Sequence, residues 1–130
     1  HNKKELTIVT VGFMGDVMIG RLMNDVIKEK GARYPWGNTL SLLKATDFNI
    51  ANLETALTRS TARVPKTFNF KSDPEHVAVL KEAHIDVVNL ANNHSRDFGD
   101  QGLLETLNVL DKAKILHVGA GKDIYQAQQP

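Results

Sequence analysis

Apolar residues fall into short runs along the chain, and two kinds of spacing alternate between polar turns. Runs rich in β-branched and aromatic residues are typical of strands, and the first has so little polar alternation that it indicates a strand covered on both faces. The predicted strands are 6–14, 47–51, 85–90 and 115–118. Between them, apolar residues recur every three or four positions, which predicts helices. These helices are 19–29, 39–44, one that opens at 72–75 with Pro74 in its first turn, and 103–113.

Strands and helices alternate without a hairpin dipeptide between consecutive strands. This pattern is typical of right-handed crossovers between parallel strands. The sequence therefore predicts an α/β fold with a mainly parallel sheet and helical crossovers. A long polar connection, 58–73, holds one extended piece, 67–71; connections of this length often carry function.

The amino-acid composition excludes several kinds of functional site. The 130 residues are 42% hydrophobic, enough for the core of one domain, and the formal charge of +1 argues against a nucleic-acid-binding surface. The absence of cysteine excludes disulfides, zinc–thiolate sites and thiol nucleophiles, so a metal would need oxygen and nitrogen ligands. No apolar run approaches the roughly 20 residues of a membrane-spanning helix.

Polar side chains follow each of the first three predicted strands. The carboxyl ends of parallel strands meet at one edge of a sheet, where ligands bind. The residues delivered there are Asp16, Asn52, Glu54, Asn92, Asn93, His94 and Asp97. Hard oxygen donors with an imidazole suit Mg²⁺, Mn²⁺, Fe or Zn²⁺. The sequence therefore predicts a divalent metal site at this edge.

Each of these residues also has a purely structural interpretation. Asp16 would cap the helix that begins near residue 19, and Glu54 would be a solvated loop residue. The Asn92–Asn93 pair would form a turn, and Asp97 or Asp100 would cap the next helix.

Of the five histidines, His94 stands out because it directly follows a strand among polar neighbours. The other four have ordinary structural interpretations: His1 at the terminus, His76 on a helix surface, His84 before a strand and His117 within one.

The long connection carries four cations: Arg59, Arg63, Lys66 and Lys71. They form either a solvated basic loop or, beside a metal edge, a site for a polyanion or phosphate. Other catalytic motifs are absent: the glycines do not form a dinucleotide fingerprint or a phosphate loop, and no serine lies on a nucleophile elbow.

Four segments occur in an order that resembles a known family. They are Gly-Asp-Val-Met-Ile-Gly-Arg at 15–21, Ala-Asn-Leu-Glu-Thr at 51–55, Asn-Asn-His-Ser-x-Asp-x-Gly at 92–99 and Gly-Ala-Gly at 119–121. Together they resemble the bacterial capsule-synthesis proteins of the CapA/PgsA family of poly-γ-glutamate biosynthesis. That family is similar to calcineurin-like metallophosphoesterases, whose fold is a sandwich of two sheets flanked by helices. The resemblance implies that residues 1–130 are the first half of such a domain, truncated at the C-terminus.

The resemblance also assigns roles at matching positions. Asp16, Glu54 and Asn93 become metal ligands, and His94 becomes the general acid toward the leaving group. Asp97 either orients His94 or supports the metal ligands from behind. The superfamily takes further histidine ligands from its second half, so this chain is expected to bind metal weakly. The missing second sheet is expected to leave an apolar sheet face uncovered and to promote self-association.

For the intact protein, the resemblance implies metal-assisted hydrolysis or transfer in capsule polymer synthesis or export at the cell envelope, outside the cytoplasm. The expected partners are an anionic polymer or phosphoester and membrane-bound synthase components, with no nucleic acid. The expected substrate-binding residues are Asn52, Arg59, Arg63, Lys66 and Lys71. Two alternatives remain: a non-catalytic accessory protein that binds the polymer, and a flavodoxin-like domain whose polar strand ends only cap helices.

Overall fold

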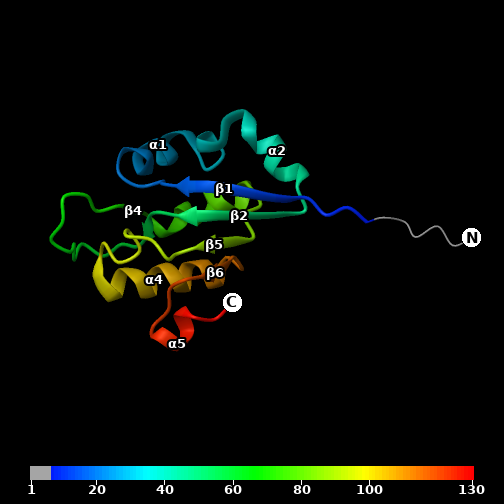
Figure 1. Cartoon of the computed structure of the whole chain (residues 1–130). Coiled ribbons are helices and arrows are strands. Elements are labelled where there is room, and N and C mark those ends of the chain that lie inside the picture. Colours follow the sequence, from blue (N-terminus) through cyan, green and yellow to red (C-terminus); the bar gives the residue numbers. More distant parts are fainter. Residues whose placement is uncertain (1–6) are drawn as a thin grey trace, which may run out of the picture.

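The computed structural model describes residues 7–130, and its main sheet contains four strands that all pair in parallel. Their order is β1-β2-β5-β6 (Figure 1). The strands are β1 (Val11–Val17), β2 (Phe48–Leu53), β5 (Val87–Asn89) and β6 (Leu116–Val118). The prediction of an α/β fold with a mainly parallel sheet and helical crossovers is confirmed.

Helices connect these strands. They are α1 (Leu22–Lys30), α2 (Leu40–Ala45), α3 (Val77–Glu82), α4 (Gly99–Lys112) and α5 (Ile124–Ala127). Two 3-10 helices, Tyr34–Thr39 and Pro74–His76, lead into α2 and α3. The prediction did not include α5 or the 3-10 helix before α2. None of the helices in the described range is long and apolar enough to cross a membrane.

The predicted boundaries 6–14 were wrong at both ends of the first strand, although residue 6 itself lies outside the described residues. β1 begins at Val11, because the backbone N–H of Thr10 is held by the side chain of Asp47 at 2.7 Å. It continues to Val17, because pairing with β2 resumes after an irregularity between Phe13 and Asp16.

A second, very small sheet closes the long connection. β3 (Ala56–Leu57) pairs in parallel with β4 (Lys71–Ser72). Of the predicted extended piece 67–71, only the last residue belongs to a strand. The loop between β3 and β4 projects from the end of the molecule toward which β1 and β2 point (Figure 1).

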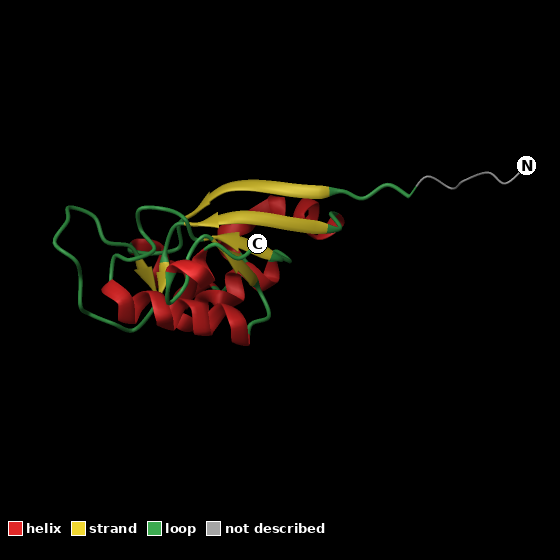
Figure 2. Ribbon diagram, turned by 60° about the horizontal axis from the view of Figure 1, so that its bottom comes forward, coloured by secondary structure: helices red, strands yellow, loops and turns green. Residues whose placement is uncertain are grey.

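The helices bury one face of the main sheet. Inward-facing Leu53 and Val88 pack with Leu80 and Leu110 of α3 and α4 in a single apolar cluster. Burying each such side chain stabilises the fold by about 1.5–3 kcal/mol. In Figure 2 the longest strands lie along one side of the molecule and most of the helices on the other.

The opposite face of the sheet is open. Strand register aligns Phe13, Ile50, Val87 and Leu116 in one row across all four strands, and Phe13 and Leu116 are 79% and 64% exposed. The prediction that the first strand is covered on both faces was therefore wrong for the described residues. We call this row the open-face row.

The prediction that His76 lies on a helix surface was also wrong. His76 ends the 3-10 helix before α3, and its ring is buried, with Nδ1 2.7 Å from Ser72 Oγ. Burial lowers the pKa of His76 below its ordinary value.

Candidate functional site

Polar side chains gather where the parallel strands end. The pairing of β1 with β2 contains a bulge between Phe13 and Asp16, so that Asp16 lies opposite Asn52. Uninterrupted alternation would place Asp16 on the same face as Met14, toward the helices. The bulge instead puts it on the open face, in keeping with the tendency of bulges to redirect side chains near functional sites.

A carboxamide network holds Asp16 in place. Asn52 Nδ2 donates to Asp16 Oδ1 at 2.7 Å. Asn52 Oδ1 accepts from Asn89 Nδ2 at 2.8 Å and from Asn92 Nδ2 at 3.1 Å. These contacts make Asn52 a positioning residue for Asp16. Asn89 was missed in the sequence analysis, although two-residue periodicity in β5 places it on the same face as Val87.

His94 and Asp97 form a buried pair at the start of the segment that follows β5. His94 Nδ1 lies 2.7 Å from Asp97 Oδ2, which also accepts from the backbone N–H of Phe70 at 2.6 Å. An ionised carboxylate only accepts hydrogen bonds, so Nδ1 carries the proton in this contact. Nε2 therefore points away from Asp97 and lies 3.8 Å from Glu54 Oε1. The ring of Phe70 stacks on His94 at a centroid distance of 4.0 Å.

Lys66 reaches this pair from the loop between β3 and β4. Its Nζ lies 2.5 Å from Asp97 Oδ1 and donates to the backbone carbonyl of Asn93 at 2.7 Å. Among the described residues, Lys66 is the counter-charge for Asp97 Oδ1, which has no hydrogen bond of regular geometry. Lys66, expected at the substrate, thus has partners inside the protein.

The other three cations of the loop lie in different surroundings. Arg59 pairs with Glu75. Lys71 is half-buried over the ring of Phe98, and Arg63 is exposed. The structure thus separates the four cations that the sequence placed in one group.

The capping interpretations do not hold. α1 begins at Leu22 and α4 at Gly99, and neither N-terminus has a side-chain cap. Asp16, Asp97 and Asp100 therefore do not cap these helices.

The turn interpretation does hold for Asn92, whose Oδ1 accepts from the backbone N–H of His94 at 3.0 Å. The same side chain also belongs to the carboxamide network. Asn93 is exposed, with a side chain that forms no hydrogen bond to residues 7–130.

Four side chains at this edge are of the types that bind divalent ions. Asp16 and Glu54 offer carboxylates, Asn93 a carboxamide and His94 its Nε2, all suitable for a divalent ion. Within residues 7–130, however, no three His, Asp or Glu side chains form a group that could hold a metal ion. Completing a shell would require further ligands. We call these four residues the rim.

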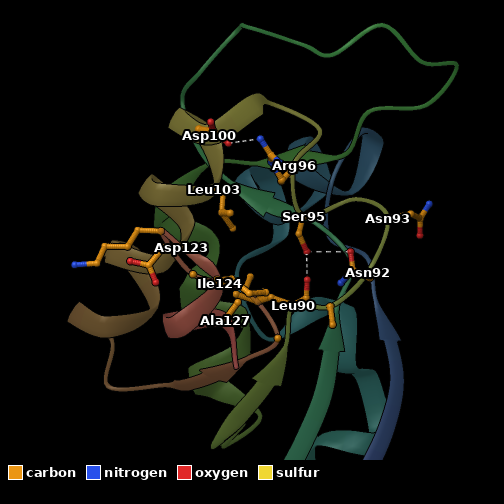
Figure 3. A pocket seen from close by; sticks show the side chains of 15 residues that line it. Leu90, Asn92, Asn93, Ser95, Arg96, Asp100, Leu103, Asp123, Ile124 and Ala127 are labelled. Carbon is orange, nitrogen blue, oxygen red and sulfur yellow. Dashed lines mark hydrogen bonds and ion pairs between the residues drawn. The ribbon is translucent and has the colours of Figure 1, made fainter. Parts of the chain in front are cut away.

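A cavity of about 740 Å³ lies beside the rim (Figure 3). Its lining comes from the turn 92–96, the start of α4 and the segment that leads into α5. The side chain of Asn93 points away from it. Asp16, Glu54 and His94 are not among its lining residues. Of the four rim residues, only Asn93 borders the cavity.

Comparison with known proteins agrees with the motifs at the rim. The chain is 32% identical over 124 residues to the PGA biosynthesis protein CapA of Bacillus subtilis, covering 94% of this chain and 33% of that protein. It is 29% identical over 127 residues to the capsule biosynthesis protein CapA of Bacillus anthracis, covering 95% and 30%. It is 32% identical over 156 residues to a probable polyglutamine synthesis accessory protein of Mycobacterium tuberculosis, covering 94% and 41%.

The chain thus spans roughly a third of the length of these curated relatives. The model of one protein family, described as bacterial capsule synthesis protein PGA_cap, matches residues 10–130. This match includes β1, the rim and all five helices, and the chain therefore belongs to the bacterial capsule synthesis protein family PGA_cap.

Proposed function

We propose that the chain contributes the N-terminal part of a metal-assisted hydrolase or transferase site that acts in capsule or poly-γ-glutamate synthesis or export at the cell envelope. The supporting observation is the His94–Asp97 pair, which turns Nε2 of a buried histidine toward Glu54. A buried carboxylate that fixes the ring of a histidine is a common arrangement for general acid–base chemistry. The names of the relatives supply the biological setting.

In this proposal, Asp16, Glu54 and Asn93 hold a divalent ion together with ligands from outside residues 7–130. Such an ion polarises a phosphoryl oxygen and lowers the pKa of a bound water. Asn52 keeps the carboxylate of Asp16 at the rim. Its role is to position a ligand, which typically changes metal affinity by 10–100-fold in other proteins.

His94 then supplies the proton for the leaving group. Asp97 accepts a hydrogen bond from Nδ1–H, and Phe70 stacks on the ring, so the ring orientation is fixed and Nε2 can donate a proton in one direction. In the imidazolium form, Nε2–H gives its proton to the departing oxygen. The reaction class is hydrolysis or transfer at a phosphoester.

The test is hydrolysis of a generic phosphodiester by the intact protein with Mn²⁺, together with capsule production in cells. His94→Ala should lower turnover by about 10²–10⁴-fold, the usual contribution of a general acid. His84→Ala is the matched control, because His84 is exposed and precedes β5, whereas the rim residues Asn93 and His94 follow that strand. Unchanged turnover in His94→Ala would contradict the proposal.

The second candidate is an accessory protein that binds the anionic polymer and supports a membrane-bound synthase without chemistry of its own. Arg63, an exposed cation of the loop between β3 and β4, favours it, as does the word accessory in the name of one relative. The same variants discriminate the two functions. Loss of capsule in His94→Ala with unchanged polymer binding favours catalysis, whereas normal capsule in His94→Ala favours the accessory function.

A further inference from the structure

A basic cleft of about 580 Å³ lies between the start of α1 and the loop that joins β3 to β4. Its lining includes three cations and two aromatic rings. These residues are Arg21, Arg63, Lys71, Phe68 and Phe98. Arg21 was not among the candidate residues of the sequence analysis.

The three cations of the cleft are not neutralised by the protein. Within residues 7–130, Arg21, Arg63 and Lys71 have no carboxylate oxygen within 4.0 Å. Lys71 Nζ donates to the backbone carbonyl of Ser60 at 2.6 Å, which leaves it two further protons. The carboxylate of Asp73 also lines the cleft, but Lys28 Nζ lies 2.8 Å from it and lowers its pKa. The cleft therefore presents uncompensated positive charge.

The backbone at Arg21 supports a role for this side chain. Arg21 has φ 53° and ψ −129°, a conformation that costs free energy for any residue with a Cβ. Its neighbour Gly20 allows the turn to press against β4, since a Cβ there would lie 2.8 Å from the carbonyl oxygen of Lys71. The turn thus holds Arg21 beside Phe68, with Cζ 5.6 Å from the ring centroid. Strained backbone of this kind is concentrated at functional sites.

The side chains around the cleft favour carboxylates over nucleic acid. Single-stranded nucleic acids bind largely by stacking bases on bare aromatic rings. Here Phe98 is buried beneath Lys71, and Phe68, although 53% exposed, has the guanidinium of Arg21 over its ring. Guanidinium groups bind carboxylates through paired hydrogen bonds, which require no stacked base.

We propose that this cleft binds successive carboxylates of an anionic polymer and leads the chain to His94. Phe68 of the cleft lies 6.5 Å from Phe70, ring centroid to ring centroid, and Phe70 stacks on His94, so a row of three rings leads from the cleft to His94. The inference rests on the proposed function, because it takes the anionic polymer as the ligand. Among the expected polymer-binding residues, Arg21 takes the place of the loop cations Arg59 and Lys66, because those two have carboxylate partners within the protein.

The experiment measures binding of fluorescently labelled poly-γ-glutamate to the intact protein across a range of salt concentrations. Arg21→Gln and Arg63→Gln should each weaken binding about three- to tenfold, and the double variant more, with a shallower salt dependence. Arg59→Gln is the matched control and should stay within about twofold, because Arg59 already pairs with Glu75. Circular dichroism of each variant checks that the fold is retained.

Three outcomes would overturn the inference: no measurable polyglutamate binding by the wild-type protein, equal losses in Arg59→Gln and the cleft variants, or wild-type affinity in the double variant. Tighter binding of polyphosphate or of single-stranded DNA of matched charge would overturn the assignment to a polycarboxylate. Phosphodiester hydrolysis measured on the same variants separates this inference from the proposed function. Polymer binding that depends on the cleft, without any hydrolysis, supports the inference and contradicts catalysis. Hydrolysis without polymer binding supports catalysis and contradicts the inference.

Discussion

The fully buried carboxylate of Asp97 lies 2.7 Å from His94 Nδ1, and this contact joins the segment after β5 to the loop between β3 and β4. That loop supplies the two other partners of this carboxylate among the described residues: the ammonium of Lys66 and the backbone N–H of Phe70. The loop is therefore part of the framework that orients the candidate catalytic histidine.

Lys66→Met should destabilise the protein, because it leaves a buried carboxylate without its counter-charge. Breaking a buried ion pair from one side typically costs 3–5 kcal/mol, and partial exposure of Lys66 reduces this to about 2–3 kcal/mol. The measurement is the free energy of unfolding in urea. Lys122→Met, at an exposed lysine, is the control. A cycle with Asp97→Asn should show coupling of about 1–3 kcal/mol, and strictly additive effects would contradict the pairing.

The sequence was most informative where local spacing determines structure. Alternating strand and helix patterns predicted the parallel sheet, and parallel strands bring their following loops to one edge, which correctly placed Asp16 and Asn52 together. The bulge in β1 was beyond such reasoning, because periodicity does not reveal an extra residue in one strand.

Contacts between segments that are distant in the sequence could not be predicted from local spacing either. Lys66 lies in a loop without periodicity, and its approach to Asp97 depends on tertiary packing. β3 and β4 are each two residues long, too short for a recognisable strand pattern. His76 is buried because a 3-10 turn precedes α3, which helical spacing alone does not predict.

His76 should make stability depend on pH. Burial, the largest cause, lowers the pKa of His76 below its ordinary value of 6.5, with Lys28 acting in the same direction and Asp73 and Glu75 opposing it. The unfolded chain therefore binds more protons as the pH falls below about 6.5, so the free energy of unfolding decreases there and is fully regained above that pH. Urea denaturation between about pH 5 and 7 measures this.

The His76→Gln variant should have a flatter stability profile than the wild type over the same pH range. His84→Gln is its control, because His84 is exposed, and it should keep the wild-type slope. A wild-type slope in His76→Gln would show that another group causes the pH dependence.

Mn²⁺ should bind the 130-residue chain no more tightly than micromolar, because the rim provides only part of a coordination shell. Asp16→Asn should weaken the remaining binding, and Asn52→Ala should weaken it about tenfold by releasing the carboxylate of Asp16. Isothermal titration calorimetry measures each affinity, with Asp25→Asn, at an exposed carboxylate of α1, as the control. Sub-micromolar binding by the wild-type chain would contradict the partial shell.

The open-face row should cause the 130-residue chain to self-associate at micromolar concentration. Phe13 and Leu116 lie at opposite edges of the sheet, with Ile50 and Val87 between them, so the exposed apolar surface extends across all four strands. Removing apolar surface from water is worth about 25 cal/mol per Å², and contiguous apolar patches of several hundred Å² commonly mark contact sites. Light scattering should therefore give a mass above that of the monomer.

The double variant Phe13→Glu/Leu116→Glu should shift this chain toward the monomer, because association would bury two charges without partners. Leu42→Glu is the control, since Leu42 is 69% exposed on α2 and lies outside the open-face row. β1 and β6 are also edge strands, whose free backbone groups offer a different route to association. Pairing through those edges would leave the association of Phe13→Glu/Leu116→Glu largely intact, and this result, or a monomeric wild-type chain, would contradict association through the open-face row.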